Sequence, residues 1–196
     1  MFHRRTLLMA GLATLAAPGI AHANSVSQEI DISSTVAGAC GMGNPGQEEI
    51  NVGDMTDADG LLDSRLRGAM VDDNYVVIPN AWCNTPHKLT MAMTPMTLQD
   101  PPPYAQPSYM ARDVTYTASL KNWAPAPAGP MTLRVHGPSG ETSSTYLSAL
   151  AARNDGLTLE ISQLAALNQS YGENQNLMLE VGSYKGTVTI TLATNP

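Results

Sequence analysis

Hydrophobic and polar residues alternate with a period of two near both ends of the chain. From Val26 to Val36 the even positions are mostly apolar, whereas the odd positions between them are all polar. From Thr187 to Leu192 three threonines alternate with three aliphatic residues. A period of two places successive side chains on opposite faces of a strand. Both segments are therefore predicted to be strands with one apolar face.

Between these two segments, short runs that alternate or are rich in β-branched residues are separated by turn residues. We predict strands at 75–78, 88–93, 114–120, 131–135, 157–161 and 176–181, and a less clearly patterned one at 50–52. One or two short helices are expected as connections, one capped by Ser143 or Ser144 and reaching 151, the other at 162–167. About eight short strands in one domain indicate an all-β, antiparallel sandwich.

The first 23 residues have the pattern of a secretory signal peptide. Arg4 and Arg5 precede an apolar stretch at 7–17 and a small-residue exit at 21–23. We expect Asn24 to begin the mature chain, and the apolar stretch is too short to span a bilayer. The arginine pair leaves both the general secretory and the twin-arginine routes open. An exported protein without a membrane span is predicted.

The amino-acid composition and net charge exclude one class of binding partner. The chain has 196 residues, of which 43% are apolar and 14% charged, and this length suits one domain. Its formal charge is −7, and removal of two signal-peptide arginines makes the mature chain more acidic still. Nucleic acid is excluded as a partner class, because binding its phosphates requires clustered basic residues.

Cys40 and Cys83 are the only cysteines of the chain. In an oxidising compartment a lone pair of cysteines is predicted to form a disulfide rather than a metal site or a nucleophile. Closing a loop of this length would stabilise the fold by about 4 kcal/mol in the chain-entropy treatment.

Two metal hypotheses arise from the sequence. The acidic segment 53–73 contains six aspartates, but the order of an EF-hand fails because Leu62 stands where glycine is needed. A solvated acidic loop is the simpler interpretation. Three spaced methionines near His87 suit Cu(I), yet two of them share a strand face with Leu89, where methionine commonly fills a core. The three methionines are Met91, Met93 and Met96.

The sequence motifs give little support for catalysis or for sugar binding. There is no G-x-S-x-G motif, and neither His87 nor His136 has a carboxylate at useful spacing. We expect both histidines on the surface, and we expect no enzyme activity and no cofactor. Trp82 and Trp123 could form a platform for a carbohydrate, but Trp82 is expected to pack over the disulfide beside it.

Four features together resemble a known family. They are the strand leading into Cys40, Cys83 at the end of a second strand, the strand at 116–120, and the final segment 182–192 with the sequence GSYKGTVTITL. They resemble the spore coat protein U domain, a family that includes pilin subunits of archaic chaperone–usher systems. The resemblance covers most of the mature chain.

The resemblance implies an immunoglobulin-like sandwich that lacks its last strand. Residues 1–23 would then be the signal peptide, 24–34 an N-terminal extension that acts as donor strand, and 35–196 the pilin-like domain. Val26, Ile30 and Ile32 would enter an acceptor groove on a neighbouring subunit, which is lined by Val188, Ile190 and Leu192. We expect no further strand to cover the 187–193 edge.

The implied function is that of a structural subunit of an extracellular fibre or surface coat, serving adhesion or biofilm formation. Its partners would be a periplasmic chaperone, an usher, and neighbouring copies of itself or related subunits. It would pass through the periplasm to the cell surface. Two alternatives remain open: residues 24–34 fold back on their own domain, or the protein is a self-contained exported module that binds copper or carbohydrate.

Overall fold

The computed structural model describes residues 31–68, 75–123, 130–135, 142–148, 155–170 and 172–194. Internal contacts divide the chain into residues 1–36 and residues 37–196, and all of the described strands lie in the second unit. Helical structure in the described part is confined to one short 3-10 helix, η1 (Ser64–Arg67). Within these ranges no helix has the length and apolar character needed to cross a membrane.

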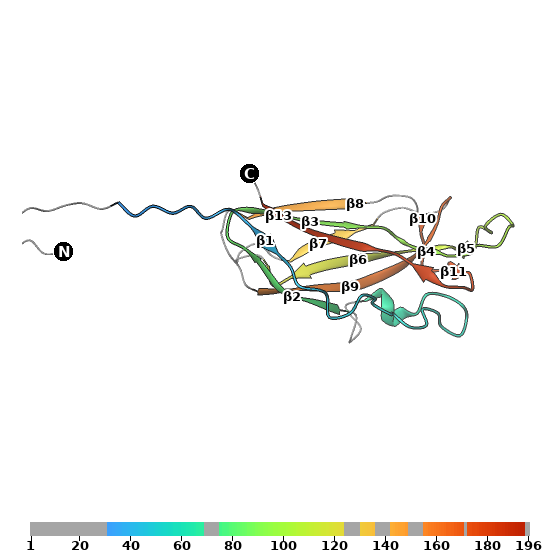
Figure 1. The fold of residues 1–196 in the computed structure, drawn as a ribbon. Coiled ribbons are helices and arrows are strands. Elements are labelled where there is room, and N and C mark those ends of the chain that lie inside the picture. Colours follow the sequence, from blue (N-terminus) through green and yellow to red (C-terminus); the bar gives the residue numbers. More distant parts are fainter. Residues whose placement is uncertain are drawn as a thin grey trace, which may run out of the picture. The chain divides into compact units, whose positions relative to one another are not determined.

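The second unit is built around an antiparallel sheet of eight strands (Figure 1). The main path of this sheet runs in the order β1 (Cys40–Gly41), β2 (Tyr75–Cys83), β9 (Asp155–Asn168), β6 (Asp113–Lys121), β4 (Met96–Leu98) and β12 (Tyr184–Lys185). Two further strands join it, β7 (Met131–Arg134) beside β6 and β10 (Gly172–Glu173) beside β9.

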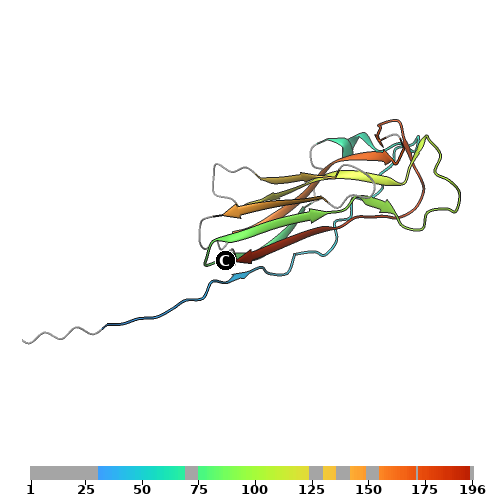
Figure 2. The ribbon, with the colours of Figure 1, turned by 90° about the horizontal axis from the view of Figure 1, so that it is seen from above.

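A second, three-stranded sheet completes the sandwich. β3 (His87–Met93) lies in its middle, between β13 (Val188–Thr194) and β8 (Thr142–Ser148), and both pairings are antiparallel. The two views in Figures 1 and 2 show this sheet lying over the layer that contains β6 and β9. β11 (Met178–Leu179) and β5 (Met110–Ala111) form a separate, parallel two-stranded sheet. The predicted all-β antiparallel sandwich is confirmed.

The core lies between the two sheets and follows the period of two. Leu89, Met91 and Met93 of β3 are at most 2% exposed and alternate with more exposed neighbours. They belong to one buried cluster with Val114 and Tyr116 of β6. Met91 and Met93 are therefore core residues, as the pattern of β3 predicts.

Several predicted elements are found and others are not. The predictions at 75–78, 88–93, 114–120, 131–135, 157–161 and 187–192 coincide with β2, β3, β6, β7, β9 and β13. Residues 176–181 contain only the short β11, and 50–52 form no strand. The two predicted helices are wrong: 142–148 is β8 and 162–167 continues β9. Pairing with β3 and β6 outweighs the local capping signals in these segments.

Tyr116 connects the two sheets through its hydroxyl group. Its ring is 3% exposed, and the hydroxyl donates to the Thr94 carbonyl at 2.7 Å and lies 3.2 Å from the Thr187 carbonyl. Thr94 follows β3 and Thr187 precedes β13. The hydroxyl therefore holds the β3–β13 pair at the end where β3 stops and β13 begins. Burial raises the pKa of Tyr116 from 10.0 to about 12.

Replacing this tyrosine gives a first prediction. Tyr116→Phe should lower the free energy of unfolding by about 1–2 kcal/mol at pH 8, because the partly buried Thr94 carbonyl loses its hydroxyl donor. Since the folded pKa exceeds the unfolded one, the tyrosine's proton-linked stabilisation is complete below pH 10 and is lost as the pH rises through about 12. Denaturant titrations at pH 8 and pH 11 should show a smaller alkaline loss in Tyr116→Phe than in the parent protein. An equal loss in both would contradict this assignment.

Candidate functional site: the open edge of strand β13

β13 is an edge strand of the smaller sheet. Along one side it pairs with β3 over its whole length, from Val188 opposite Met93 to Thr194 opposite His87. Along its other side, no strand of the described chain pairs with it. β1 comes close to β13 but pairs only with β2. The seam between the two sheets is therefore not closed by main-chain pairing at this edge.

Apolar side chains at this edge are only partly covered. Val188, Ile190 and Leu192 pack against the buried core and are half-buried, whereas the threonines between them are exposed. Their ladder partners on β3 are Met93, Met91 and Leu89, all of which are at most 2% exposed. The inner face of β13 is thus the one that the sequence alternation predicts. Its apolar surface is less completely covered than that of the strand beside it.

The main-chain groups of the same residues face the open side. The Thr94 amide donates to the Thr187 carbonyl at 2.9 Å, so Thr187 turns its carbonyl toward β3. In an antiparallel ladder the direction of the N–H and C=O groups alternates from one residue to the next. The main-chain groups of Val188, Ile190 and Leu192 consequently point away from β3. Each of these residues presents an apolar side chain to the interior and hydrogen-bonding groups to the free edge.

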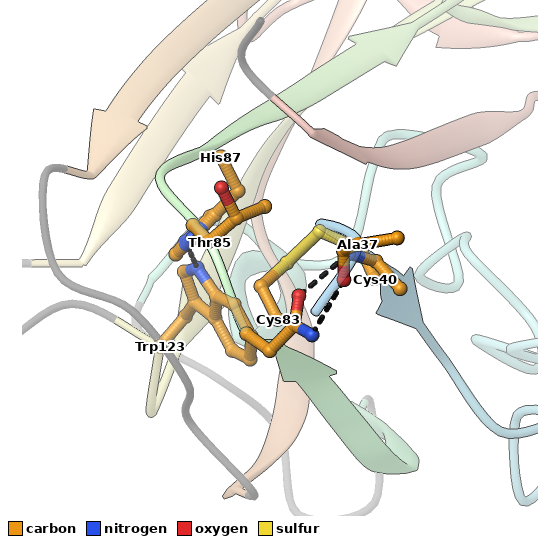
Figure 3. Close-up of a disulfide and its surroundings, with 8 residues drawn as sticks. Ala37, Cys40, Cys83, Thr85, His87 and Trp123 are labelled. Atoms are coloured by element: carbon orange, nitrogen blue, oxygen red, sulfur yellow. Dashed lines mark hydrogen bonds between the residues drawn. A yellow bond between two sulfur atoms is a disulfide. The ribbon is translucent and has the colours of Figure 1, made fainter. Parts of the chain in front are cut away.

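The segment before β1 is fixed to the domain at residues 37–40, which we call its root (Figure 3). Cys40 and Cys83 form the predicted disulfide and face each other in the β1–β2 pair. The Asn84 side chain accepts from the Ala39 amide at 2.6 Å and donates to the Ala37 carbonyl at 2.9 Å. The Asn84 amide donates to the Ala39 carbonyl at 3.0 Å. One covalent bond and three hydrogen bonds thus hold residues 37–40.

The residues before this root are exposed. Ile32 is 96% exposed and Val36 is 85% exposed, and residues 31–36 form no strand. The predicted strand over 26–36 is thus not formed over 31–36, where the described chain offers it no ladder partner. Val26 and Ile30 lie outside the described residues. The donor role assigned to Val26, Ile30 and Ile32 stays a prediction.

His87 corrects the expectation of a surface histidine. It is 1% exposed, and the Trp123 indole N–H donates to its Nε2 at 2.8 Å (Figure 3). The rings meet edge to face with centroids 5.0 Å apart. Trp123 is itself 3% exposed, whereas Trp82 is 39% exposed and lies against Gly41. The two tryptophans therefore do not share an exposed face. His136 lies outside the described residues.

The acidic loop uses its carboxylates to shape its own backbone. Asp54 accepts from the Thr56 amide at 3.0 Å, and Asp57 accepts from the Asp59 and Leu61 amides at 3.0 Å each. The Thr56 amide contact is the main cause that lowers the pKa of Asp54. Across the described ranges, no three His, Cys, Asp or Glu residues gather as they would around a metal ion.

The segment 182–187 positions the start of β13. Tyr184 in β12 donates its hydroxyl to the Glu180 carbonyl at 2.7 Å, and the Ala111 carbonyl lies at 3.1 Å. Gly182 has φ 149°, and a Cβ there would lie 2.5 Å from a Leu98 methyl carbon. The sequence motif thus has a physical role in the turn that precedes the open edge.

Comparisons with known proteins add no relative: no family model, no curated protein and no solved structure matches the chain.

Hydrogen exchange tests the open edge directly. The amides of Val188, Ile190 and Leu192 should exchange at least about tenfold faster than those of Thr189 and Thr191, because only the latter point toward β3. NMR-detected exchange of the purified monomer, corrected for intrinsic rates, measures this alternation. Uniform protection along β13 would mean that another segment covers the edge.

Proposed function

We propose that this protein is a structural subunit of an extracellular fibre or surface coat, assembled by donation of a strand from one subunit to the next. The observation that carries the proposal is the unpaired edge of β13 with its half-buried row Val188, Ile190 and Leu192. An edge of this kind is a template for another strand, and soluble proteins ordinarily cover or blunt it. β13 has neither a proline nor a charged side chain that would discourage such pairing.

The N-terminal segment has the properties that the edge requires in a partner. Ile32 and Val36 are exposed and share one face of an alternating sequence, with Asp31, Ser33 and Thr35 on the other. Added along β13, such a segment would form main-chain hydrogen bonds with the free edge. Its isoleucines would cover the apolar side chains that the described chain leaves half-exposed. Backbone pairing would supply affinity, and the apolar row would fix the register.

The root of the segment supports donation to another molecule. The disulfide and the Asn84 side chain hold residues 37–40 in the domain, so a donated strand stays firmly attached to the subunit from which it comes. A contact between the head of one subunit and the tail of the next does not close on itself, and its repetition yields a filament. Before assembly, a periplasmic chaperone would cover the edge, and an usher would exchange it for the next subunit.

Strand exchange of this kind needs no cofactor and no bond-making chemistry. The driving force is the better covering of the acceptor row together with the gain of edge hydrogen bonds. The burial of Met91 and Met93 in the core speaks against the copper alternative, because neither thioether is exposed to an incoming ion. Adhesion and biofilm formation are the biological roles that such a fibre would serve.

A charged residue on the apolar face of the donor segment tests the proposal. Ile32→Asp should leave the monomer folded but reduce polymer growth by at least about tenfold, since a carboxylate would be buried without a partner. The measurement is the length distribution of polymers, seen as a ladder that disappears on boiling in detergent.

Ser33→Asp is the matched control, because it adds the same charge to the polar face of the same segment. It should polymerise as the parent protein does. Normal polymers from Ile32→Asp, or equal impairment by both variants, would refute the donor role of this segment.

A further inference from the structure

A hollow of about 400 Å³ lies at β9, beside η1, and none of its described lining residues belongs to β13. In Figure 1, η1 and β13 lie on opposite sides of β9. The hollow is framed by η1, β7, β9 and β10, and its charged lining residues are Arg67, Arg134 and Glu173. Its volume is within the range of pockets that take small ligands.

An irregularity in β9 forms one wall. Thr115 pairs with Ala165 and Thr117 with Ser162, so Gln163 and Leu164 together oppose the single residue Tyr116. Gln163 has φ 52°, a left-handed conformation that is unfavourable for a side chain of this kind. Bulges are frequent beside binding sites because they redirect side chains. Here the bulge brings the Gln163 carbonyl within 2.9 Å of Arg134 Nη1.

The first of the two arginines is held rigidly. Arg134 donates through Nη1 to the Thr117 hydroxyl at 3.1 Å and through Nη2 to Glu173 at 3.0 Å. Glu173 also accepts from the Thr115 hydroxyl at 3.1 Å. The positive charge of Arg134 is therefore balanced within the hollow, and its guanidinium plane is fixed by three different elements.

The second arginine is held by main-chain carbonyls rather than by a carboxylate of the described lining. Arg67 donates through Nη2 to the Leu62 and Gln175 carbonyls, and its buried Nε has no hydrogen-bond partner. Among the described residues it forms no ion pair, whereas its neighbour Arg65 pairs with Asp63 at 2.5 Å. Among the described lining residues the charged side chains are two guanidinium groups and one carboxylate, and the charge of Arg67 adds to that of Arg65 in lowering the pKa of Asp63.

We propose that this hollow binds the carboxylate of an acidic sugar, such as a uronic acid unit of an extracellular polysaccharide. A guanidinium recognises a carboxylate with directed, often paired hydrogen bonds. The amide side chains of Gln163, Asn174 and Gln175 also line the hollow, and amides of this kind bind hydroxyl groups as donors and acceptors. A hollow of this volume that is lined also by Leu62 and Leu164 suits a ring bearing several hydroxyls better than an extended acidic peptide.

The test is a titration of the purified full-length protein with tetragalacturonate, followed by NMR chemical shifts. Saturable shifts at residues of β9 and β10 are expected, and a neutral galactose tetramer should produce none. Arg67→Gln should weaken the binding about tenfold or more, because it removes one of the two guanidinium groups and leaves a neutral polar side chain. Glu173→Gln should strengthen it, since it removes the competing carboxylate.

Arg65→Gln is the matched control, because it removes a neighbouring arginine that does not line the hollow and should bind tetragalacturonate as the parent does. If Arg65→Gln and Arg67→Gln weakened binding equally, the effect would come from the loss of any positive charge, and the proposal would be overturned. The absence of saturable binding, or equal binding of a tetraglutamate peptide, would also overturn it. None of these readouts depends on polymerisation, so strand donation is tested separately.

Discussion

Within the described residues, one edge of β13 pairs with no other strand, and this open edge is the feature on which the account depends. Val188, Ile190 and Leu192 turn their side chains inward and their main-chain groups outward, so the same three residues leave both apolar surface and hydrogen-bonding groups incompletely covered. Water can satisfy the polar groups but not the apolar ones. A strand from another molecule would satisfy both together, which neither a loop nor a small ligand could do along the whole strand.

Hydrogen bonds and the disulfide hold the segments around this edge in place. Tyr116 holds the carbonyls of Thr94 and Thr187, from which the β3–β13 ladder starts, and Tyr184 fixes the turn just before it. At the other end, the disulfide and Asn84 secure the root of the exposed N-terminal segment. In the proposed fibre, rigid attachment at the root and a preformed acceptor row would reduce the conformational entropy lost on each added subunit.

The sequence predicts those parts of the structure that depend on local patterns. The alternation in 187–192 identifies both the strand and its inner face, and the presence of only two cysteines in a chain expected to be exported identifies the disulfide. β8 is missed because its serines and threonines carry a capping signal, and only pairing with β3 makes the segment a strand.

Contacts between distant residues are the part that sequence reasoning cannot supply. His87 is buried because the Trp123 indole, 36 residues away, bonds to its ring. The hollow at β9 joins Arg67 to Arg134 across a bulge that has no glycine or proline to mark it. The positive φ of Gln163 leaves no signal in the composition of that segment.

The central claim is that β13 accepts a strand from another molecule. The most direct measurement adds a synthetic peptide of residues 24–36 to the isotope-labelled protein and records NMR contacts between the two. The account predicts contacts from the peptide's Ile30 and Ile32 to the methyl groups of Val188, Ile190 and Leu192, together with slower amide exchange at these three residues. Unchanged methyl signals at saturating peptide, or methyl contacts to the protein's own residues 24–34 in a dilute monomer, would contradict it.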